Sequence, residues 1–237
     1  MSAIDRSAVE GFLERTFELP GGGRALFTER ADGNMSSASG ERADQGESAR
    51  ERLCSGLGLE RLARGYQVHG RIVQQIKADR GDQPSGSRRA EADGQATARR
   101  GVGAMVLTAD CMPVAIGCQG AVAMLHAGWR GLAAGVLEEG IRAISELAGE
   151  GEMVAIVGPC AGVCCYEVGP EVHAPLARSR RTPGHIDLRA IAHERLLAAG
   201  VARVHDLPAC TICDERYFSH RREGARAGRQ AGVAWLS

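Results

Sequence analysis

The stretch AMVLTADCMPVAIGCQGAVAML, residues 104–125, contains three apolar runs separated by polar or glycine-bearing turns. The runs are AMVLT (104–108), PVAIG (113–117) and AVAML (121–125). Apolar runs of this length between turn residues are typical of consecutive strands in a buried sheet. The stretch therefore predicts three strands at the centre of the fold.

A membrane-spanning helix is the alternative for this region, because Asp110 is the only fully charged residue between positions 101 and 129. A segment of that length and low charge can cross a bilayer. Asp110, Pro113 and His126 nevertheless divide it into pieces of strand length. Buried strands explain the pattern better, and we expect no membrane segment.

Helices and further strands alternate on both sides of these runs. Residues 130–147 predict a helix, since Leu137, Ile141 and Ile144 recur at helical spacing, and residues 187–199 predict a second helix. A third helix is expected at 49–62, and strands are expected at 24–28, 153–157, 201–207 and 232–236. No clear linker interrupts the alternation, which predicts a single α/β domain for the whole chain.

Two polar tracts lie between the expected elements. The segment from 29 to 48 is rich in serine and charged residues, so we predict a loop or a mobile arm there. The second tract runs from 77 to 100 and includes Asp93, which precedes a glycine and is typical of a turn.

The charge balance excludes some classes of partner. The chain has 237 residues, with 29 basic and 29 acidic side chains, so its formal net charge is zero. A neutral total provides no broad attraction to polyanions, so we expect neither a nucleic-acid binder nor a binder of acidic membranes. All but one of the basic residues are arginines. Their guanidinium groups suit phosphates, although a compositional bias also explains their number.

The cysteine content and the N-terminus predict a cytoplasmic protein with reduced thiols. Eight cysteines are few for a disulfide scaffold in a chain of this length. Residues 1–19 carry acidic side chains where a signal peptide needs a basic start followed by an apolar run.

Three polar residues near expected strand ends are candidate metal ligands, namely His69, Cys111 and His126. A thiolate and two neutral imidazoles form a competent zinc shell and leave the fourth tetrahedral position for water or substrate. The separations of 42 and 15 residues match no short zinc motif. Spacing alone therefore leaves open whether these residues bind a metal or are structural side chains.

A second group of cysteines offers another metal hypothesis. The group consists of Cys160, Cys164, Cys165, Cys210 and Cys213. Four of these thiols could form a structural zinc site. Buried or site-lining thiols are the alternative, because a single CxxC pair is weak support for a metal.

The segment HAGWRG (126–131) and an arginine-rich segment near the C-terminus are candidate anion sites. Gly128 and Gly131 permit close backbone approach, and the start of the expected helix presents free N–H groups to an anion. Arg130 could add a bidentate clamp. The segments YFSHRREG (217–224) and GRQ (228–230) could seat a phosphate and stack a base, or form a solvated surface loop.

Several segments, taken together and in order, resemble the zinc-dependent purine nucleoside phosphorylase family, many of whose members carry an older label as multicopper polyphenol oxidases or laccases. The segments are QVHG (67–70), ADG (92–94), LTADCMPVAI (107–116), VAMLHAGWRGL (122–132), VGPCAGVCCYEVG (157–169), CT (210–211), YFSHRR (217–222) and GRQAG (228–232). The resemblance covers residues from about 65 to the C-terminus.

The resemblance implies a fold, an activity and a set of metal ligands. The implied fold is an α/β single-domain sandwich of mixed sheet with flanking helices. The implied activity is phosphorolysis of adenosine, inosine and methylthioadenosine, accompanied by adenosine deamination, and the implied zinc ligands are His69, Cys111 and His126. This chain departs from the family pattern at residues 32–40, where relatives usually carry a Ser-Leu-Asn segment.

This activity requires a proton carrier and a phosphate pocket. In deamination, a water activated by zinc would attack C6 of adenosine while Asp110 or Glu167 shuttles the proton. In phosphorolysis, phosphate attacks the anomeric carbon, and the helix start with Arg130, together with Arg221 or Arg222, could hold that anion. The expected partners are thus a purine nucleoside and phosphate.

Three alternative functions remain open on the sequence. Copper-dependent phenol oxidation needs several metal centres and more histidines in short motifs than the seven scattered ones of this chain. A non-enzymatic binding protein could use its thiols for a structural zinc ion. A hydrolase with Cys111 as nucleophile is the third alternative.

Overall fold

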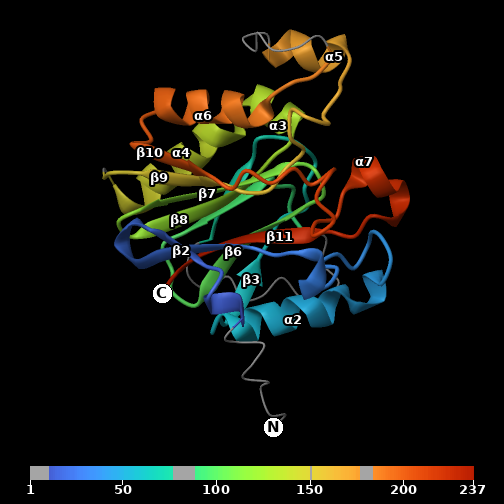
Figure 1. Cartoon of the computed structure of the whole chain (residues 1–237). Coiled ribbons are helices and arrows are strands. Elements are labelled where there is room, and N and C mark those ends of the chain that lie inside the picture. Colours follow the sequence, from blue (N-terminus) through green and yellow to red (C-terminus); the bar gives the residue numbers. More distant parts are fainter. Residues whose placement is uncertain (1–10, 77–88, 150, 177–183) are drawn as a thin grey trace.

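Two mixed β-sheets lie at the centre of the computed structural model, which describes residues 11–76, 89–149, 151–176 and 184–237 (Figure 1). Within these ranges the first sheet has six strands, in the order β10 (Arg203–Asp206), β9 (Val154–Val157), β7 (Met112–Cys118), β8 (Ala121–Ala127), β5 (Gly94–Thr97) and β4 (Val73–Ile76). Strand β10 pairs with β9 in parallel, as β4 does with β5, and the other pairs are antiparallel.

The second sheet contains five strands within the same described ranges. Their order is β1 (Phe17–Leu19), β2 (Gly23–Phe27), β11 (Gln230–Leu236), β6 (Val102–Thr108) and β3 (Arg61–Ala63). Only β3 and β6 pair in parallel. The C-terminal strand thus lies at the centre of this sheet, between two segments that are far apart in the sequence.

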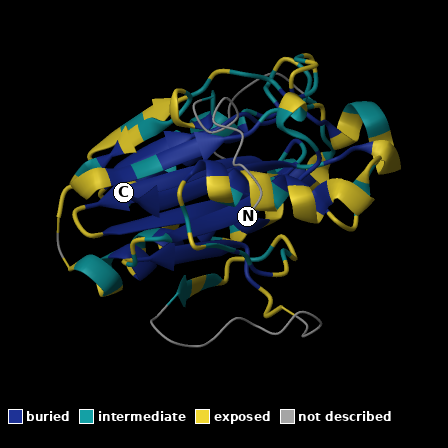
Figure 2. Ribbon diagram, turned by 90° about the horizontal axis from the view of Figure 1, so that it is seen from below, coloured by how far each residue is buried: buried dark blue, intermediate teal, exposed yellow. Residues whose placement is uncertain are grey.

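The central strands are buried on both faces, which explains their continuous apolar runs. In β8, Val122 and Met124 belong to the core between the two sheets, whereas Ala123 and Leu125 belong to the core on the outer face. In Figure 2 the strands form a buried interior beneath exposed helices and loops.

Helices cover the outer faces of the sheets. The six-stranded sheet is covered by α4 (Val136–Ala148) and α6 (Leu188–Ala198), and the five-stranded sheet by α2 (Gly46–Gly56) (Figure 1). The described residues also form α3 (Trp129–Ala134), α5 (Pro170–His173), α7 (His220–Glu223) and 3-10 turns at Pro20–Gly22, Arg30–Asp32, Ala43–Gln45, Ala174–Leu176 and Gly224–Arg226. The expected α/β sandwich of mixed sheet with flanking helices is confirmed.

Residues 104–125 form three strands as predicted, but the three strands do not all lie in one sheet. Strands β7 and β8 pair as a hairpin, whereas β6 lies in the opposite sheet between β11 and β3. Residues 109–111 therefore connect the two sheets. None of the helices in the described part of the chain is both long and apolar enough to traverse a lipid bilayer.

Two predicted helices differ from the observed ones because of glycines. The helix expected at 130–147 is divided at Gly135, whose φ of 96° lies in the left-handed region. The helix expected at 49–62 begins and ends earlier, at Gly46 and Gly56, and is followed by Gly58, which is left-handed with a φ of 66°, and by β3. A glycine in the left-handed conformation ends a helix at little cost, which the apolar spacing does not reveal.

The polar segment 29–48, predicted as a loop or mobile arm, packs against the C-terminal region of the chain. Asn34 and Met35 are buried. The amide of Asn34 donates to the carbonyls of Ser39 and Glu41, and its Oδ1 accepts the N–H of Arg229 at 2.9 Å. Side-chain bonds to the backbone thus order a segment that has few apolar residues.

Candidate metal centre

The three predicted metal ligands lie together beside the hairpin of β7 and β8. His126 is part of β8, Cys111 directly precedes β7, and His69 lies in the loop before β4. One ring nitrogen of each histidine and the thiol sulfur all lie within 4.8 Å of one another. Residues separated widely in the sequence thus form one group, which we call the His–Cys–His triad.

The triad is closed on one side and open on the other. His126 is buried, Cys111 is half-buried and His69 is exposed. The two imidazole rings meet edge to face, with centroids 4.8 Å apart and an angle of 73° between their planes. Two imidazoles and a thiolate at this separation fit one zinc ion, and the exposed side leaves its fourth position accessible.

Asp93 holds two of the three ligands in place. Its buried carboxylate lies 2.8 Å from Nδ1 of His126. Since a carboxylate only accepts, Nδ1 carries the proton and Nε2 faces the metal position. The same carboxylate accepts the backbone N–H groups of Val68, His69 and Gly70 at 2.7–3.1 Å. Burial raises the pKa of Asp93, but these bonds from His126 and the backbone lower it to below its ordinary value.

The sequence predicts only a turn at Asp93, and this interpretation is incomplete. The ADG segment at 92–94 does form a turn into β5, but the aspartate is fully buried and bonded to a ligand. A turn residue that also supports a histidine has the same sequence pattern as one that does not.

Asp110 fixes the loop that carries Cys111. Its φ of 84° places it in the left-handed region, which aspartate tolerates better than most residues. Its Oδ1 accepts the hydroxyl of Thr211 and its Oδ2 accepts the N–H of Arg221, both at 2.7 Å. Both oxygens of this candidate proton carrier are therefore engaged in holding the crossover between the sheets.

The charges of the triad favour a metal-binding thiolate. Burial raises the pKa of Cys111, but the neighbouring His126 and His69 lower it further, to about 6. Burial lowers the pKa of His126, whereas the Cys111 thiolate and Asp93 raise it to about 9. A thiolate and a buried carboxylate at this position concentrate negative charge where a cation would bind.

Two glycines of the HAGWRG segment allow close approach to the triad, as the sequence predicts. A Cβ on Gly128 would lie 2.9 Å from the sulfur of Cys111 and 3.2 Å from Cδ2 of His69. A Cβ on Gly131 would lie 2.9 Å from the carbonyl oxygen of Gly70. The two distances of 2.9 Å are shorter than a carbon atom tolerates, so these positions require glycine.

Gly128→Ala is expected to lower the affinity of the triad for a divalent metal ion about tenfold or more. Overpacking costs about 1–3 kcal/mol, and 1.4 kcal/mol corresponds to a factor of ten. Competition with a chelating indicator measures the affinity. Gly151→Ala is the matched control, because a Cβ there meets no atom within 4 Å. Equal affinities in the two variants would contradict the close approach.

The predicted anion-binding residues differ in their surroundings. Arg130 is exposed and stacks on Trp129 at 4.3 Å, at the start of a helix of only six residues. Arg221 is exposed, stacks on Tyr166 at 5.0 Å and donates to the backbone carbonyl of Glu167 at 2.9 Å. The side chain of Glu167 is exposed.

Arg222 is held by the chain itself. Its guanidinium donates to the carbonyls of Thr211, Ile212 and Tyr217 and to the carboxylate of Glu223, at 2.6–2.9 Å. These bonds bind the turn around α7 to the preceding segment. Arg222 thus stabilises the turn that presents Arg221.

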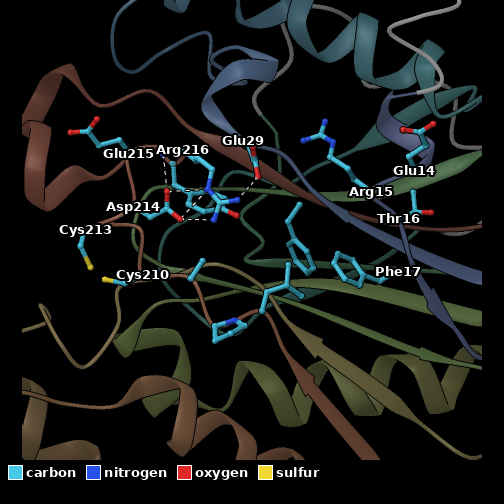
Figure 3. A pocket seen from close by; sticks show the side chains of 15 residues that line it. Glu14, Arg15, Thr16, Phe17, Glu29, Cys210, Cys213, Asp214, Glu215 and Arg216 are labelled. Carbon is cyan, nitrogen blue, oxygen red and sulfur yellow. Dashed lines mark hydrogen bonds and ion pairs between the residues drawn. The ribbon is translucent and has the colours of Figure 1, made fainter.

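A cavity of about 840 Å³ lies away from the triad, between the N-terminal segment and residues 207–217 (Figure 3). Arg216 lines it and pairs with Asp214 at 2.7 Å. None of the triad residues lines this cavity. The cavity is therefore separate from the triad, although Cys210 and Cys213 are among the residues that line it.

A family described as "Multi-copper polyphenol oxidoreductase laccase" matches residues 22–237. The chain belongs to this laccase family. Proteins named purine nucleoside phosphorylase are similar to it. One from Xylella fastidiosa is 38% identical, over 92% of this chain and 88% of its own length, and one from Corynebacterium glutamicum is 33% identical, over 90% and 94%.

Solved structures show the same fold as this laccase-family chain. YlmD from Geobacillus stearothermophilus has a TM-score of 0.81 and 29% identity, with 91% of this chain and 92% of that one covered. A Neisseria meningitidis protein has a TM-score of 0.79 and 29% identity, with 94% and 99% covered.

Two further residues of this laccase-family chain, Tyr166 and Arg229, lie near the triad, and neither is predicted to lie there from the sequence. Burial raises the pKa of Tyr166, and the nearby Cys111 thiolate raises it further. Burial lowers the pKa of Arg229, whereas the negative charges of Cys111 and Asp110 oppose this. Both residues lie in quoted motifs, but their proximity to Cys111 depends on how distant loops fold together.

Proposed function

We propose that this chain is a zinc-dependent purine nucleoside phosphorylase that acts on adenosine, inosine and methylthioadenosine and also deaminates adenosine. The observation that carries the proposal is the His–Cys–His triad with Asp93 behind it and one side open to solvent. The names of the relatives from Xylella fastidiosa and Corynebacterium glutamicum support it.

The donor atoms favour zinc over a multicopper centre. Among the described residues, the triad is the only potential ligand group that contains histidine, and the other group consists of cysteines alone. Multicopper phenol oxidation needs several centres supplied mainly by histidine. The family's copper label therefore fits these side chains less well than the phosphorylase names do.

We assign separate roles in metal binding, positioning and proton transfer to the residues of the site. When bound, zinc would supply a Lewis acid and lower the pKa of a water molecule in its open position. Asp93 keeps Nε2 of His126 free for the metal. Since both oxygens of Asp110 are engaged, we assign Asp110 to positioning and the exposed Glu167 to proton transfer.

Phosphorolysis requires an anion site beside the nucleoside. A phosphate oxygen bonds to C1′ of the ribose while the C1′–N9 bond breaks. The electron pair of the C1′–N9 bond leaves with the base. We assign phosphate binding to the exposed Arg221 and Arg130. Arg222 is not part of this proposal, because its guanidinium is bonded to three carbonyls and a carboxylate.

Arg221→Ala is expected to raise the KM for phosphate about 10-fold to 100-fold with little change in kcat. A hydrogen bond to a charged group contributes about 1.5–3 kcal/mol, and uniform binding appears in KM. Steady-state kinetics with varied phosphate measures both constants. Arg203→Ala is the control, because Arg203 is an exposed arginine paired with the exposed Glu152. An unchanged KM would remove Arg221 from the phosphate site.

A nucleoside panel tests the function directly. Zinc-loaded protein is incubated with adenosine, inosine or methylthioadenosine, with and without phosphate. We expect free base and ribose 1-phosphate (5-methylthioribose 1-phosphate from methylthioadenosine) in equal amounts, only when phosphate is present. Ammonia release from adenosine without phosphate tests the deaminase activity separately. No base release from any of the three nucleosides would overturn the phosphorylase proposal.

We further propose that these reactions take place in the cytoplasm. All eight cysteines are free in the structure, including four whose sulfur atoms lie within 4.8 Å of one another. Unpaired thiols at such short distances are typical of a reducing compartment.

A further inference from the structure

A second group of potential metal ligands lies apart from the His–Cys–His triad. Its sulfur atoms belong to Cys164, Cys165, Cys210 and Cys213, and they all lie within 4.8 Å of one another. We call these residues the four-thiol cluster. Figure 3 shows two of them, Cys210 and Cys213, at one end of the cavity with their sulfur atoms turned toward each other.

The topology of the six-stranded sheet explains why the cysteines meet. Strands β9 and β10 are parallel neighbours, so the loops after them leave the sheet at the same edge. The first loop contributes the adjacent pair Cys164 and Cys165, and the second contributes the CxxC pair. A parallel bridge between Cys160 and Cys210 aligns the two loops.

The fifth cysteine of this region has a different role. Cys160 is buried and its sulfur accepts a hydrogen bond from Arg189 at 3.3 Å. Burial raises its pKa to about 11. Cys160 therefore aligns the loops through its backbone, and its thiol is not a ligand.

The distances within the cluster fit a shared metal ion. The sulfur of Cys213 lies 3.7 Å from that of Cys164 and 3.5 Å from that of Cys165. A Zn–S bond of about 2.3 Å in tetrahedral geometry separates ligand sulfurs by about 3.8 Å. A disulfide would require about 2.05 Å.

The backbone around the cluster is shaped to admit sulfur. The N–H of Gly162 donates to the sulfur of Cys210 at 3.2 Å. A Cβ on Gly162 would lie 3.0 Å from Cβ of Cys210 and 3.3 Å from the sulfurs of Cys164 and Cys210. Gly162 thus has the same relation to this cluster as Gly128 has to the triad.

The charges within the cluster require compensation. As metal ligands, the four cysteines would all be thiolates, with their sulfur atoms within 4.8 Å of one another. Four neighbouring sulfurs can all be thiolates only if a cation offsets their mutual repulsion.

We propose that the four-thiol cluster binds one zinc ion as a structural site, with cysteine sulfur in all four tetrahedral positions. Closed four-cysteine shells are characteristic of structural zinc, whereas a catalytic site keeps an open position. The proposal does not rest on the proposed phosphorylase activity, because the cluster shares no ligand with the triad.

The proposed zinc ion joins two loops that support the triad. The loop of Cys164 and Cys165 continues into Tyr166, on which Arg221 stacks. The loop of Cys210 contains Thr211, whose hydroxyl binds Asp110 next to Cys111. Zinc in the cluster would hold these loops in register.

Metal analysis of the purified full-length chain tests the proposal. After expression with zinc and removal of loose metal, the protein is expected to contain two zinc ions per chain. Cys164→Ser and Cys213→Ser should each contain one, and Cys111→Ala should also contain one. Cys54→Ser should keep both zinc ions, because Cys54 lies on α2 and belongs to neither ligand group. It is a matched control, since it is half-buried like Cys165 and Cys210.

Cobalt substitution keeps the test valid even if the serine variants unfold. Thiolate–cobalt charge-transfer absorption grows with the number of cysteine ligands, so Cys111→Ala loaded with cobalt should keep an intense band from four thiolates. Absence of that band would overturn the proposal. So would a wild-type chain with one zinc ion that is lost in Cys111→Ala and kept in Cys213→Ser, or a disulfide within the cluster.

Discussion

Cys111→Ala is expected to lose one zinc ion per chain and to reduce kcat/KM for inosine phosphorolysis about 10³-fold. The substitution removes the only thiolate of the His–Cys–His triad. Metal ions supply several kcal/mol of transition-state stabilisation, and about 4 kcal/mol corresponds to that factor. Metal analysis and product release, measured on the same preparation, give both quantities.

Cys54→Ala is the control for this variant. Cys54 is also half-buried, and its sulfur donates to the carbonyl of Leu59, far from the triad in the fold. It should retain zinc and activity. Undiminished product in a Cys111→Ala protein that has lost the triad's zinc would remove the catalytic role of the metal.

Asp93→Asn is expected to lower the zinc affinity of the triad about 10-fold to 100-fold, which is typical of residues that orient a metal-bound histidine. The asparagine has one acceptor oxygen where the carboxylate accepts from His126 and three backbone N–H groups. Unsatisfied buried donors should also lower the free energy of unfolding by about 1–3 kcal/mol. Zinc titration and chemical denaturation measure the two effects.

Asp44→Asn, at an exposed position, is the matched control and should change neither quantity. Because Asp93 acts through the ligands, saturating zinc should restore most of the activity of Asp93→Asn. Wild-type zinc affinity in this variant, or lost activity that saturating zinc does not restore, would contradict its assignment as a positioning residue.

The strands of the fold could be predicted from the sequence, because burial on both faces leaves long apolar runs such as 104–108 and 121–125. Their distribution over two sheets could not, since a run that faces two cores has the same composition in either sheet. Strand β5 lies in a polar tract, where Gln95 and Thr97 are buried without an apolar pattern.

The candidate site could be predicted in part. His69, Cys111 and His126 stand out as polar residues among apolar ones, and the family resemblance adds to that signal. The support by Asp93 depends on the pairing of β5 with β8, which places residue 94 beside Leu125. The hydrogen bonds from Arg222 to three backbone carbonyls likewise form only in the folded turn, so the sequence does not reveal them.

We propose that the triad holds a zinc ion that phosphorolysis requires. The most direct test of this proposal is phosphate-dependent release of hypoxanthine from inosine by protein stripped with a chelator and reloaded with either zinc or copper. We predict that activity disappears on stripping and returns with zinc. Activity that survives stripping, or protein that retains several copper ions per chain and oxidises phenols without cleaving inosine, would contradict the claim.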